Sequence, residues 1–286
     1  MRLVVTGAGG MLGGAVCAAA RAAGHEVLAL DRAALDVTDA AACRERLVAA
    51  RPDAVVNCAA WTDVDGAEIE EAQATAVNGA GAGNVAAGAA VARARIVHVS
   101  TDYVFPGDGR DPYVESDAVG PRTAYGRSKL AGEIAVAAAG ADHAIARTAW
   151  LFGAGGANFV DTMLRLGAER DELRVVDDQI GCPTWTGHLA PALVALAAGR
   201  ARGVFHAAGG GRATWFELAR EALSLAGSHR RVEPTTTAEF PRPAARPAFS
   251  VLASERGADA VRLPDWREGL RGHLADIRSP TPGGTP

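Results

Sequence analysis

The sequence predicts an α/β protein in which a Rossmann-like, doubly wound parallel sheet carries a smaller C-terminal substrate-binding lobe. Three observations lead to this fold class. Short apolar strands alternate with Ala-rich helices, a glycine-rich turn joins the first strand to the first helix, and polar residues collect where strands end. Strands that alternate with helices in this way form βαβ units and parallel sheets. Ligands of such sheets bind outside the carboxyl ends of the strands.

The first strand and turn form a predicted dinucleotide-binding element. Leu3 to Thr6 are typical of a buried strand, Gly7 to Gly13 of a turn, and Gly14 to Ala23 of a helix. In a Gly-x-x-Gly-x-x-Gly turn between a strand and a helix, backbone N–H groups at the helix N-terminus face a pyrophosphate. The expected cofactor contacts in this turn are Gly7, Gly9, Gly10, Met11, Leu12 and Gly13.

The second predicted strand, Glu26 to Leu30, ends at Asp31, where a carboxylate is placed to bind an adenosine ribose. Arg32 follows directly and has the charge to bind a 2′-phosphate. The two residues favour different cofactors, so the choice between NADPH and NADH stays open. The alternative for Asp31 is a turn or helix cap.

The third predicted strand brings a further segment to the same edge. Thr38-Asp39 caps a helix that ends near Ala50, and Ala54 to Asn57 form the strand. The small residues of the segment 58–62, Ala59 among them, permit close approach of a cofactor, whereas Trp61 is equally well a packing residue.

One long helix is expected from near Glu68 to Ala92. Inside it, Asn78 is either a buried residue that bonds the backbone or a member of the site. The fourth strand, Ile96 to Ser100, is followed by Thr101, whose hydroxyl is placed to bond a substrate carbonyl.

Tyr125 and Lys129 form the candidate acid/base pair. Positions i and i+4 share one face of a helix, so the phenol and the ammonium can occupy one small volume. A cation about 4 Å from a phenol, at an effective dielectric constant of about 20, lowers its pKa by at most ~3 units. The fifth strand, His143 to Arg147, ends at this edge too. Three strand ends and the glycine turn therefore converge where the pair lies.

Several strings together resemble the extended short-chain dehydrogenase/reductases and, within them, the dTDP-4-dehydrorhamnose reductases. They are the glycine turn, the string 100–107 (STDYVFPG), the string 125–133 (YGRSKLAGE) and Arg147 to Trp150. Asn158-Phe159, the string 177–184 (DDQIGCPT) and the string 246–252 (RPAFSVL) agree with them, so that the resemblance covers residues 1 to about 277.

The resemblance implies NADPH-dependent reduction of the C4 ketone of dTDP-4-dehydro-L-rhamnose, with NADH as the alternative cofactor. Tyr125 is expected to protonate the new alkoxide, Lys129 to bind the nicotinamide ribose and to lower the phenol's pKa, and Thr101 to hold the carbonyl oxygen. The chain departs from the family pattern at Trp61, where a smaller or polar residue is expected. Further cofactor contacts implied by position are Asp31, Arg32, Asp36, Val37, Ala60, Trp61 and Thr62, and the implied substrate contacts are Thr101, Asp102, Val104, Trp150, Asn158 and Arg246.

We expect three segments: a cofactor domain at 1–156, a mixed α/β lobe with chain crossovers at 157–278, and a disordered Pro/Gly-rich tail at 279–286. Within the lobe, Arg246 is placed to meet either a phosphate or a surface carboxylate.

Composition narrows the expected partners. The net charge of −4 argues against a nucleic-acid surface, and four scattered cysteines suggest neither a zinc site nor disulfides. No apolar run reaches the ~18 residues of a membrane helix. We therefore expect a cytoplasmic protein with a dTDP-sugar as its ligand and no metal. A homodimer is left open, with Glu217 and Glu268 available to bridge a metal between subunits.

Two other readings of the sequence stay open. The first is another sugar-nucleotide 4-ketoreductase or an epimerase, which share the glycine turn and the Tyr/Lys pair. A dehydratase is disfavoured, because Tyr103 stands where such enzymes need a Glu after the Asp. The second is a non-catalytic regulatory subunit such as that of methionine adenosyltransferase, which resembles the same family.

Overall fold

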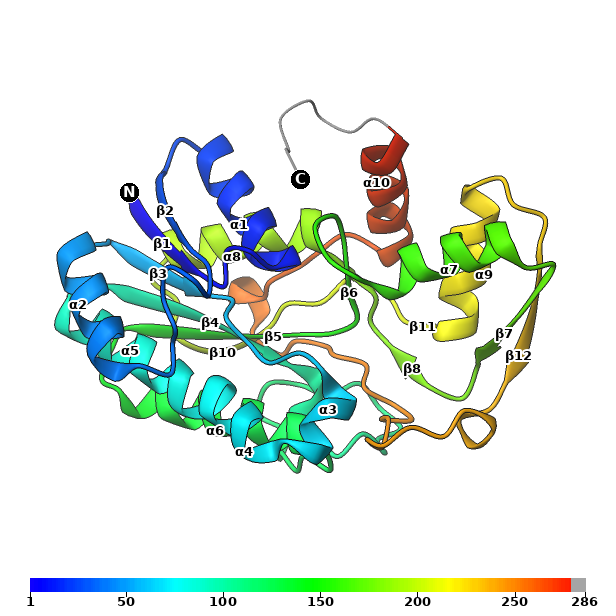
Figure 1. Cartoon of the computed structure of the whole chain (residues 1–286), viewed down its shortest axis with the longest axis horizontal. Helices are drawn as coiled ribbons and strands as arrows, with labels where there is room; N and C mark the ends of the chain where they lie inside the picture. Colours follow the sequence, from blue (N-terminus) through cyan, green and yellow to red (C-terminus); the bar gives the residue numbers. More distant parts are fainter. Residues whose placement is uncertain (279–286) are drawn as a thin grey trace.

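The core of the protein is a six-stranded parallel sheet in the order β10-β5-β4-β3-β1-β2 (Figure 1). The structure is a computed structural model and describes residues 1–278; the predicted disordered tail lies outside them. This topology confirms the predicted fold class. The strands are β1 (Arg2–Thr6), β2 (Glu26–Leu30), β3 (Ala54–Asn57), β4 (Arg95–Thr101), β5 (His143–Thr148) and β10 (Gly203–His206).

The strand order reverses at β1, which pairs with β2 on one side and with β3 on the other. A doubly wound sheet binds its ligand in the crevice at such a reversal, outside the carboxyl ends of the strands. The backbones that leave β1 and β3 lie very close there. A Cβ on Gly7, whose φ is +67°, would come within 2.6 Å of the amide nitrogen of Ala59.

Helices cover both faces of the sheet (Figure 1). Because side chains alternate along a strand, Leu3 and Val5 pack in one core and Val4 packs in the other. Leu189 of α8 joins the first core and Val85 of α5 the second. The helices of the first face are α1 (Met11–Ala22) and α8 (Thr186–Ala198), and those of the second are α2 (Ala40–Ala50), α5 (Ala82–Val91) and α6 (Ala124–Ala138).

The smaller lobe lies beyond the carboxyl end of β5 and has a core of its own around Phe152, Leu218 and Trp266. The chain leaves the lobe at α8 and β10, so that residues 186–206 belong to the layers of the large sheet. The lobe contains β6 (Leu151–Phe152), α7 (Phe159–Glu169), β7 (Glu172–Val176), β8 (Ile180–Gly181), β9 (Thr184–Trp185), β11 (Ala213–Thr214), α9 (Trp215–Leu225), β12 (Arg231–Thr235) and α10 (Trp266–Arg278).

Two predicted helices differ from the observed ones. The first begins at Met11 rather than Gly14, so the end of the glycine turn is already helical. The single helix predicted from Glu68 to Ala92 is wrong, because the backbone at Glu70 (φ −120°, ψ 45°) is not helical. The chain instead forms α3 (Val64–Ile69), α4 (Glu71–Thr75), a π-helix η1 (Ala76–Gly81) and α5.

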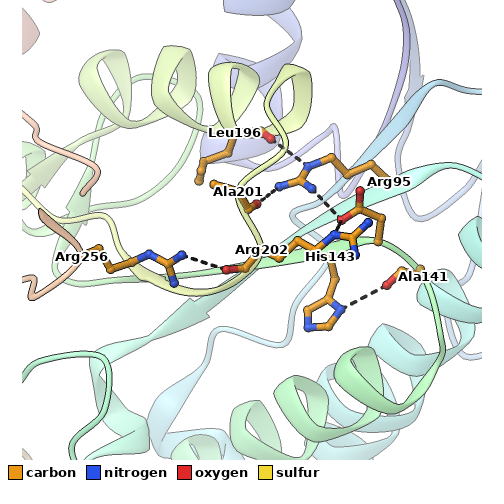
Figure 2. A network of polar contacts seen from close by, with 8 residues as sticks. Arg95, Ala141, His143, Leu196, Ala201, Arg202 and Arg256 are labelled. Carbon is orange, nitrogen blue, oxygen red and sulfur yellow. Dashed lines mark hydrogen bonds and ion pairs between the residues drawn. The ribbon is translucent and has the colours of Figure 1, made fainter. Parts of the chain in front are cut away.

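Polar contacts fasten the edge strand β10 at the end of the sheet opposite the crevice. Arg95, at the start of β4, donates to the carbonyl of Leu196 (2.9 Å) and to that of Ala201, as Figure 2 shows. Asp142 accepts from both Arg95 (2.8 Å) and Arg202 (2.9 Å). Arg95, Asp142 and Arg202 lie at the amino ends of the parallel strands, so these contacts fasten the connection from α8 to β10 and are remote from the site.

Within residues 1–278, every helix is too short or too polar to span a membrane.

Candidate active site

The glycine turn is shaped by close backbone contacts. A Cβ on Gly13 would overlap the carbonyl group of Gly7, and Gly7 itself has a left-handed backbone against Ala59. Gly10 is the N-cap of α1 and has no side chain with which to cap it, so the first N–H groups of α1 face the crevice unblocked. The turn from Gly7 to Gly13 and these N–H groups together form what we call the glycine cradle. Any side chain would fill this cradle, and it fits the pyrophosphate of a dinucleotide.

Three of the predicted cofactor contacts after β2, namely Asp31, Arg32 and Asp36, are exposed. Asp31 accepts a hydrogen bond from the amide of Ala34 (2.8 Å), so the turn-capping role weighed as its alternative is present. Asp36 accepts from the amide (2.9 Å) and hydroxyl (2.7 Å) of Thr38, and these hydrogen bonds hold the pKa of its carboxyl below the ordinary value. Arg32 is exposed beside them, and Val37 is buried below.

Asn78 fixes the segment that leaves β3. Its Oδ1 accepts from the amide of Trp61 (2.8 Å), and its Nδ2 donates to the carbonyl of Trp61 (3.0 Å) and to the hydroxyl of Ser128 (2.9 Å). The hydroxyl of Ser128 in turn donates to the carbonyl of Tyr125 (2.7 Å). One buried amide thus joins the predicted cofactor segment, Ala59 to Thr62, to the helix of Tyr125. Asn78 lies in the π-helix, a form that is frequent at functional sites.

Helix α6 presents Tyr125 in its first turn. Thr123 caps the helix by accepting from the amide of Gly126 (3.0 Å). A Cβ on Gly126 would overlap the carbonyl oxygen of Tyr103, so glycine lets α6 lie directly on the segment after β4. The ring of Tyr103 meets that of Tyr125 edge to face, with centroids 5.5 Å apart and an interplanar angle of 79°. The position of the phenol is therefore set by packing.

The phenol of Tyr125 is held in its protonated form. Burial raises the pKa of Tyr125 to about 12; a hydrogen bond with Thr101 lowers it, and the nearby charge of Asp102 raises it further. The predicted lowering of this pKa by Lys129 is wrong in this structure. The ammonium of Lys129 instead donates to the carbonyl of Val99 (2.7 Å).

Lys129 is 2% exposed. Burial lowers the pKa of Lys129 to about 8, while Glu133 and Cys58 act in the opposite direction. Of the 29 Lys and Arg residues in the sequence, Lys129 is the only lysine. An amine is a compact cation that titrates when buried, which a guanidinium does not do.

Thr101 and Asp102 lie where β4 ends, beside Tyr125. The hydroxyl of Thr101 donates to Oδ1 of Asp102 (2.9 Å) and accepts from the amide of Tyr103 (3.2 Å). Burial raises the pKa of Asp102 to about 6, opposed by hydrogen bonds from Ser250 and Thr101. Val104, two residues on, is fully buried and contributes to the core below.

Trp150 is clamped on both faces. Its φ of +47° is strained for a bulky residue, and Trp215 stacks on it with centroids 3.5 Å apart and planes at 3°. On the other face, a Cβ on Gly181 would overlap the indole. Trp150 follows Thr148, which is the register partner of Thr101, so the clamped indole stands next to the strand end that carries Thr101.

Two predicted substrate contacts have other partners. The amide of Asn158 caps α7 by accepting from the amide of Asp161 (3.0 Å), and its Nδ2 donates to the carbonyls of Gly153 (3.0 Å) and Gly156 (3.2 Å). Arg246 is paired with Asp65 (2.8 Å), which corresponds to the carboxylate alternative. It also lines a pocket of about 150 Å³ with Tyr103, Arg122 and Pro247. Among the described residues, no group of His, Cys, Asp and Glu is arranged to hold a metal ion.

The comparisons with known proteins identify the family of this chain. Residues 1–279 match the family model described as the RmlD substrate binding domain. The chain belongs to this family. One relative of this RmlD-type chain is the dTDP-4-dehydrorhamnose reductase of Streptomyces griseus, which is 48% identical over 94% of this chain and 91% of the relative. Another is a probable dTDP-4,6-dihydroxy-2-methyloxan-3-one 4-ketoreductase of Streptomyces antibioticus, 46% identical over 97% and 96%.

A solved structure similar to the RmlD-type chain is that of the Bacillus anthracis dTDP-4-dehydrorhamnose reductase in complex with NADP. It has 37% identity and a TM-score of 0.93 over 96% of this chain and 99% of that one. The family resemblance that the sequence strings predicted is therefore confirmed.

Proposed function

We propose that this protein is an NADPH-dependent oxidoreductase that reduces the C4 ketone of dTDP-4-dehydro-L-rhamnose to dTDP-L-rhamnose. The family membership and the named activities of its relatives support the reaction. The single observation that carries the chemistry is the position of the Tyr125 phenol, in the first turn of α6, beside the hydroxyl of Thr101 at the carboxyl end of β4.

In the proposed reaction NADPH, when bound, would supply the hydride that C4 receives and would become NADP⁺. Tyr125 donates its proton to O4, so that the C=O bond becomes CH–OH. A phenol that stays protonated at neutral pH is in the correct state for this step, since the alkoxide is the stronger base. The hydroxyl of Thr101 holds the carbonyl oxygen before the proton moves.

The other roles belong to residues around the cradle. Lys129 binds the nicotinamide ribose as a buried cation. The residues proposed to hold the cofactor are Gly7, Gly9, Gly10, Met11, Leu12, Gly13, Asp31, Arg32, Asp36, Val37, Ala59, Ala60, Trp61 and Thr62. Asp102 and the edge of Trp150 are proposed to face the sugar nucleotide, whereas Val104, predicted as a further substrate contact, is buried in the core below and is left out. Because NADPH and nucleotide sugars are water-soluble molecules of the cytoplasm, we place the reaction there.

A related function is favoured by a Streptomyces niveus relative named dTDP-4-keto-6-deoxy-D-glucose reductase, which is 45% identical over 92% of this chain. One assay separates the two. The purified protein is mixed with NADPH or NADH and, in parallel, with dTDP-4-dehydro-L-rhamnose and dTDP-4-keto-6-deoxy-D-glucose. We expect stoichiometric loss of nicotinamide absorbance, fastest with NADPH and the rhamnose precursor. Preference for the second sugar supports the related ketoreductase. Sugar interconversion without net NADPH oxidation indicates an epimerase, and no turnover with either sugar contradicts a catalytic role.

A further inference from the structure

A cluster of buried charges lies under the site, on the side of α6 that faces the sheet. Glu133 is 4% exposed and Arg147, on β5, is also 4% exposed. The carboxylate of Glu133 accepts two hydrogen bonds from the guanidinium of Arg147, at 2.9 and 2.7 Å. It also accepts one from the hydroxyl of Ser100, at 2.5 Å. Such a two-point pairing is the strongest arrangement of an arginine with a carboxylate.

Glu133 and Lys129 lie one helical turn apart and dock on consecutive residues of β4. Lys129 donates to the carbonyl of Val99, while Glu133 accepts from Ser100. Ser100 and Arg147 are register partners in the sheet. The cluster therefore ties α6 to β4 and β5 directly beneath the turn that carries Tyr125.

The cluster contains more positive than negative charges. Lys129 and Arg147 are two buried cations, and Glu133 is the carboxylate hydrogen-bonded between α6 and the sheet. The other titratable groups that act on or face Lys129 are Cys58, after β3, and His98, on β4. Burial raises the pKa of the Cys58 thiol and lowers that of His98, so both are neutral at pH 7.

We propose that Glu133 is a positioning residue of the active site, which offsets the charge of Arg147 and thereby keeps the Lys129 ammonium charged and docked on β4. Without the carboxylate, the guanidinium of Arg147 and the ammonium of Lys129 would both stay buried with no opposite charge beside them. The buried amine is the one that yields its proton, since a guanidinium keeps its charge in proteins. That the Lys129 ammonium binds the cofactor rests on the proposed function. That Glu133 controls the pKa of Lys129 does not rest on it.

The composition of the chain makes this titration measurable. Because Lys129 is the only lysine, protein labelled with ¹³Cε-lysine gives one side-chain NMR signal. In the wild type we expect this signal to titrate with a midpoint at about pH 8. Removing an opposite charge at close range shifts a pKa by about 1 to 3 units. For Glu133→Gln we therefore expect a midpoint at least about one pH unit lower.

Three further variants make the test sharp. Glu71→Gln is the matched control, because Glu71 also pairs with an arginine of α6, Arg127, but at 45% exposure; its midpoint should equal that of the wild type. Glu133→Asp keeps the charge and should lie between the wild type and Glu133→Gln. Glu133→Gln/Arg147→Met removes both charges together and should return to within about half a unit of the wild type.

Equal midpoints for Glu133→Gln and Glu71→Gln in folded protein overturn the proposal. If the single variant does not fold, the double variant decides, because a midpoint as low as about pH 7 there shows that Arg147 is not the charge that Glu133 offsets. A shifted midpoint with undiminished reduction of the sugar nucleotide leaves this inference standing and contradicts the role of Lys129 in the proposed function.

Discussion

The side chain of Asn78 bonds both backbone polar groups of Trp61, the amide at 2.8 Å and the carbonyl at 3.0 Å. The same side chain reaches Ser128 on α6. We expect Asn78→Ala to raise the KM for NADPH and to lower the free energy of unfolding by about 2 to 3 kcal/mol, since about 1 kcal/mol is lost per hydrogen bond. Ser128→Ala, which leaves both bonds to Trp61, should raise this KM much less. Equal cofactor kinetics in both variants and the wild type would show that the Asn78 link has no part in cofactor binding.

Gly13 and Gly14 offer a matched pair of substitutions. A Cβ on Gly13 would overlap the carbonyl of Gly7, whereas a Cβ on Gly14 would lie 3.7 Å from the carbonyl oxygen of Ala8. Overpacking costs about 1 to 3 kcal/mol, so Gly13→Ala should weaken NADPH binding by about 10- to 100-fold. Gly14→Ala should leave binding intact and stabilise α1 by about 0.5 to 1 kcal/mol. Fluorescence titration with NADPH and thermal unfolding check both; normal NADPH affinity in Gly13→Ala would refute the cradle.

The parts of the fold that depend on local sequence signals were predictable. The strand from Ala54 to Asn57 and the cap at Asp39 lie where the sequence predicts them, because apolar runs and cap residues act locally. The break at Glu70 and the π-helix around Asn78 were not predictable. In the structure α6 packs closely on the π-helix, where a Cβ on Gly132 would overlap the carbonyl oxygen of Asn78, and the local sequence does not reveal such tertiary contacts.

The clamp on Trp150 gives a prediction for the substrate side. A methyl group at Gly181 would displace the indole, so Gly181→Ala should raise the KM for the sugar nucleotide and leave NADPH affinity unchanged. It should also change the near-UV circular dichroism of the stacked Trp150 and Trp215. Gly120→Ala is the control, since its Cβ would meet its nearest neighbour at 3.8 Å. An unchanged sugar KM with an altered spectrum would separate Trp150 from the substrate.

The raised pKa of Asp102 predicts how the stability of the protein depends on pH. Its folded-state pKa of about 6 lies above the ordinary value, so its contribution to stability is full at low pH and declines as pH rises from about 4 to 6. Asp102→Asn removes this titration. Relative to the wild type, the variant should gain about 2 to 3 kcal/mol in unfolding free energy between pH 4 and pH 8, as about 1.4 kcal/mol follows from each pKa unit. Urea denaturation at the two pH values measures it; a pH-independent difference would contradict the assigned pKa.

The site itself was only partly predictable from sequence. The strings around Thr101, Tyr125 and Lys129 predicted which residues form the site, but not their electrostatics. The predicted acidification of Tyr125 assumed an ammonium beside the phenol, whereas the structure docks Lys129 on Val99 and lets burial dominate. The pairing of Glu133 with Arg147 was not predicted, because Arg147 lies on a strand 14 residues further along the chain.

The most direct test of the central claim is the turnover of Tyr125→Phe with NADPH and dTDP-4-dehydro-L-rhamnose. The substitution removes the proton donor and keeps the ring that packs on Tyr103. We expect kcat to fall by about 100-fold or more, the usual weight of a general acid, while the Kd for NADPH and the melting temperature stay at the wild-type values. A kcat equal to that of the wild type would contradict the assignment of Tyr125 as the proton donor.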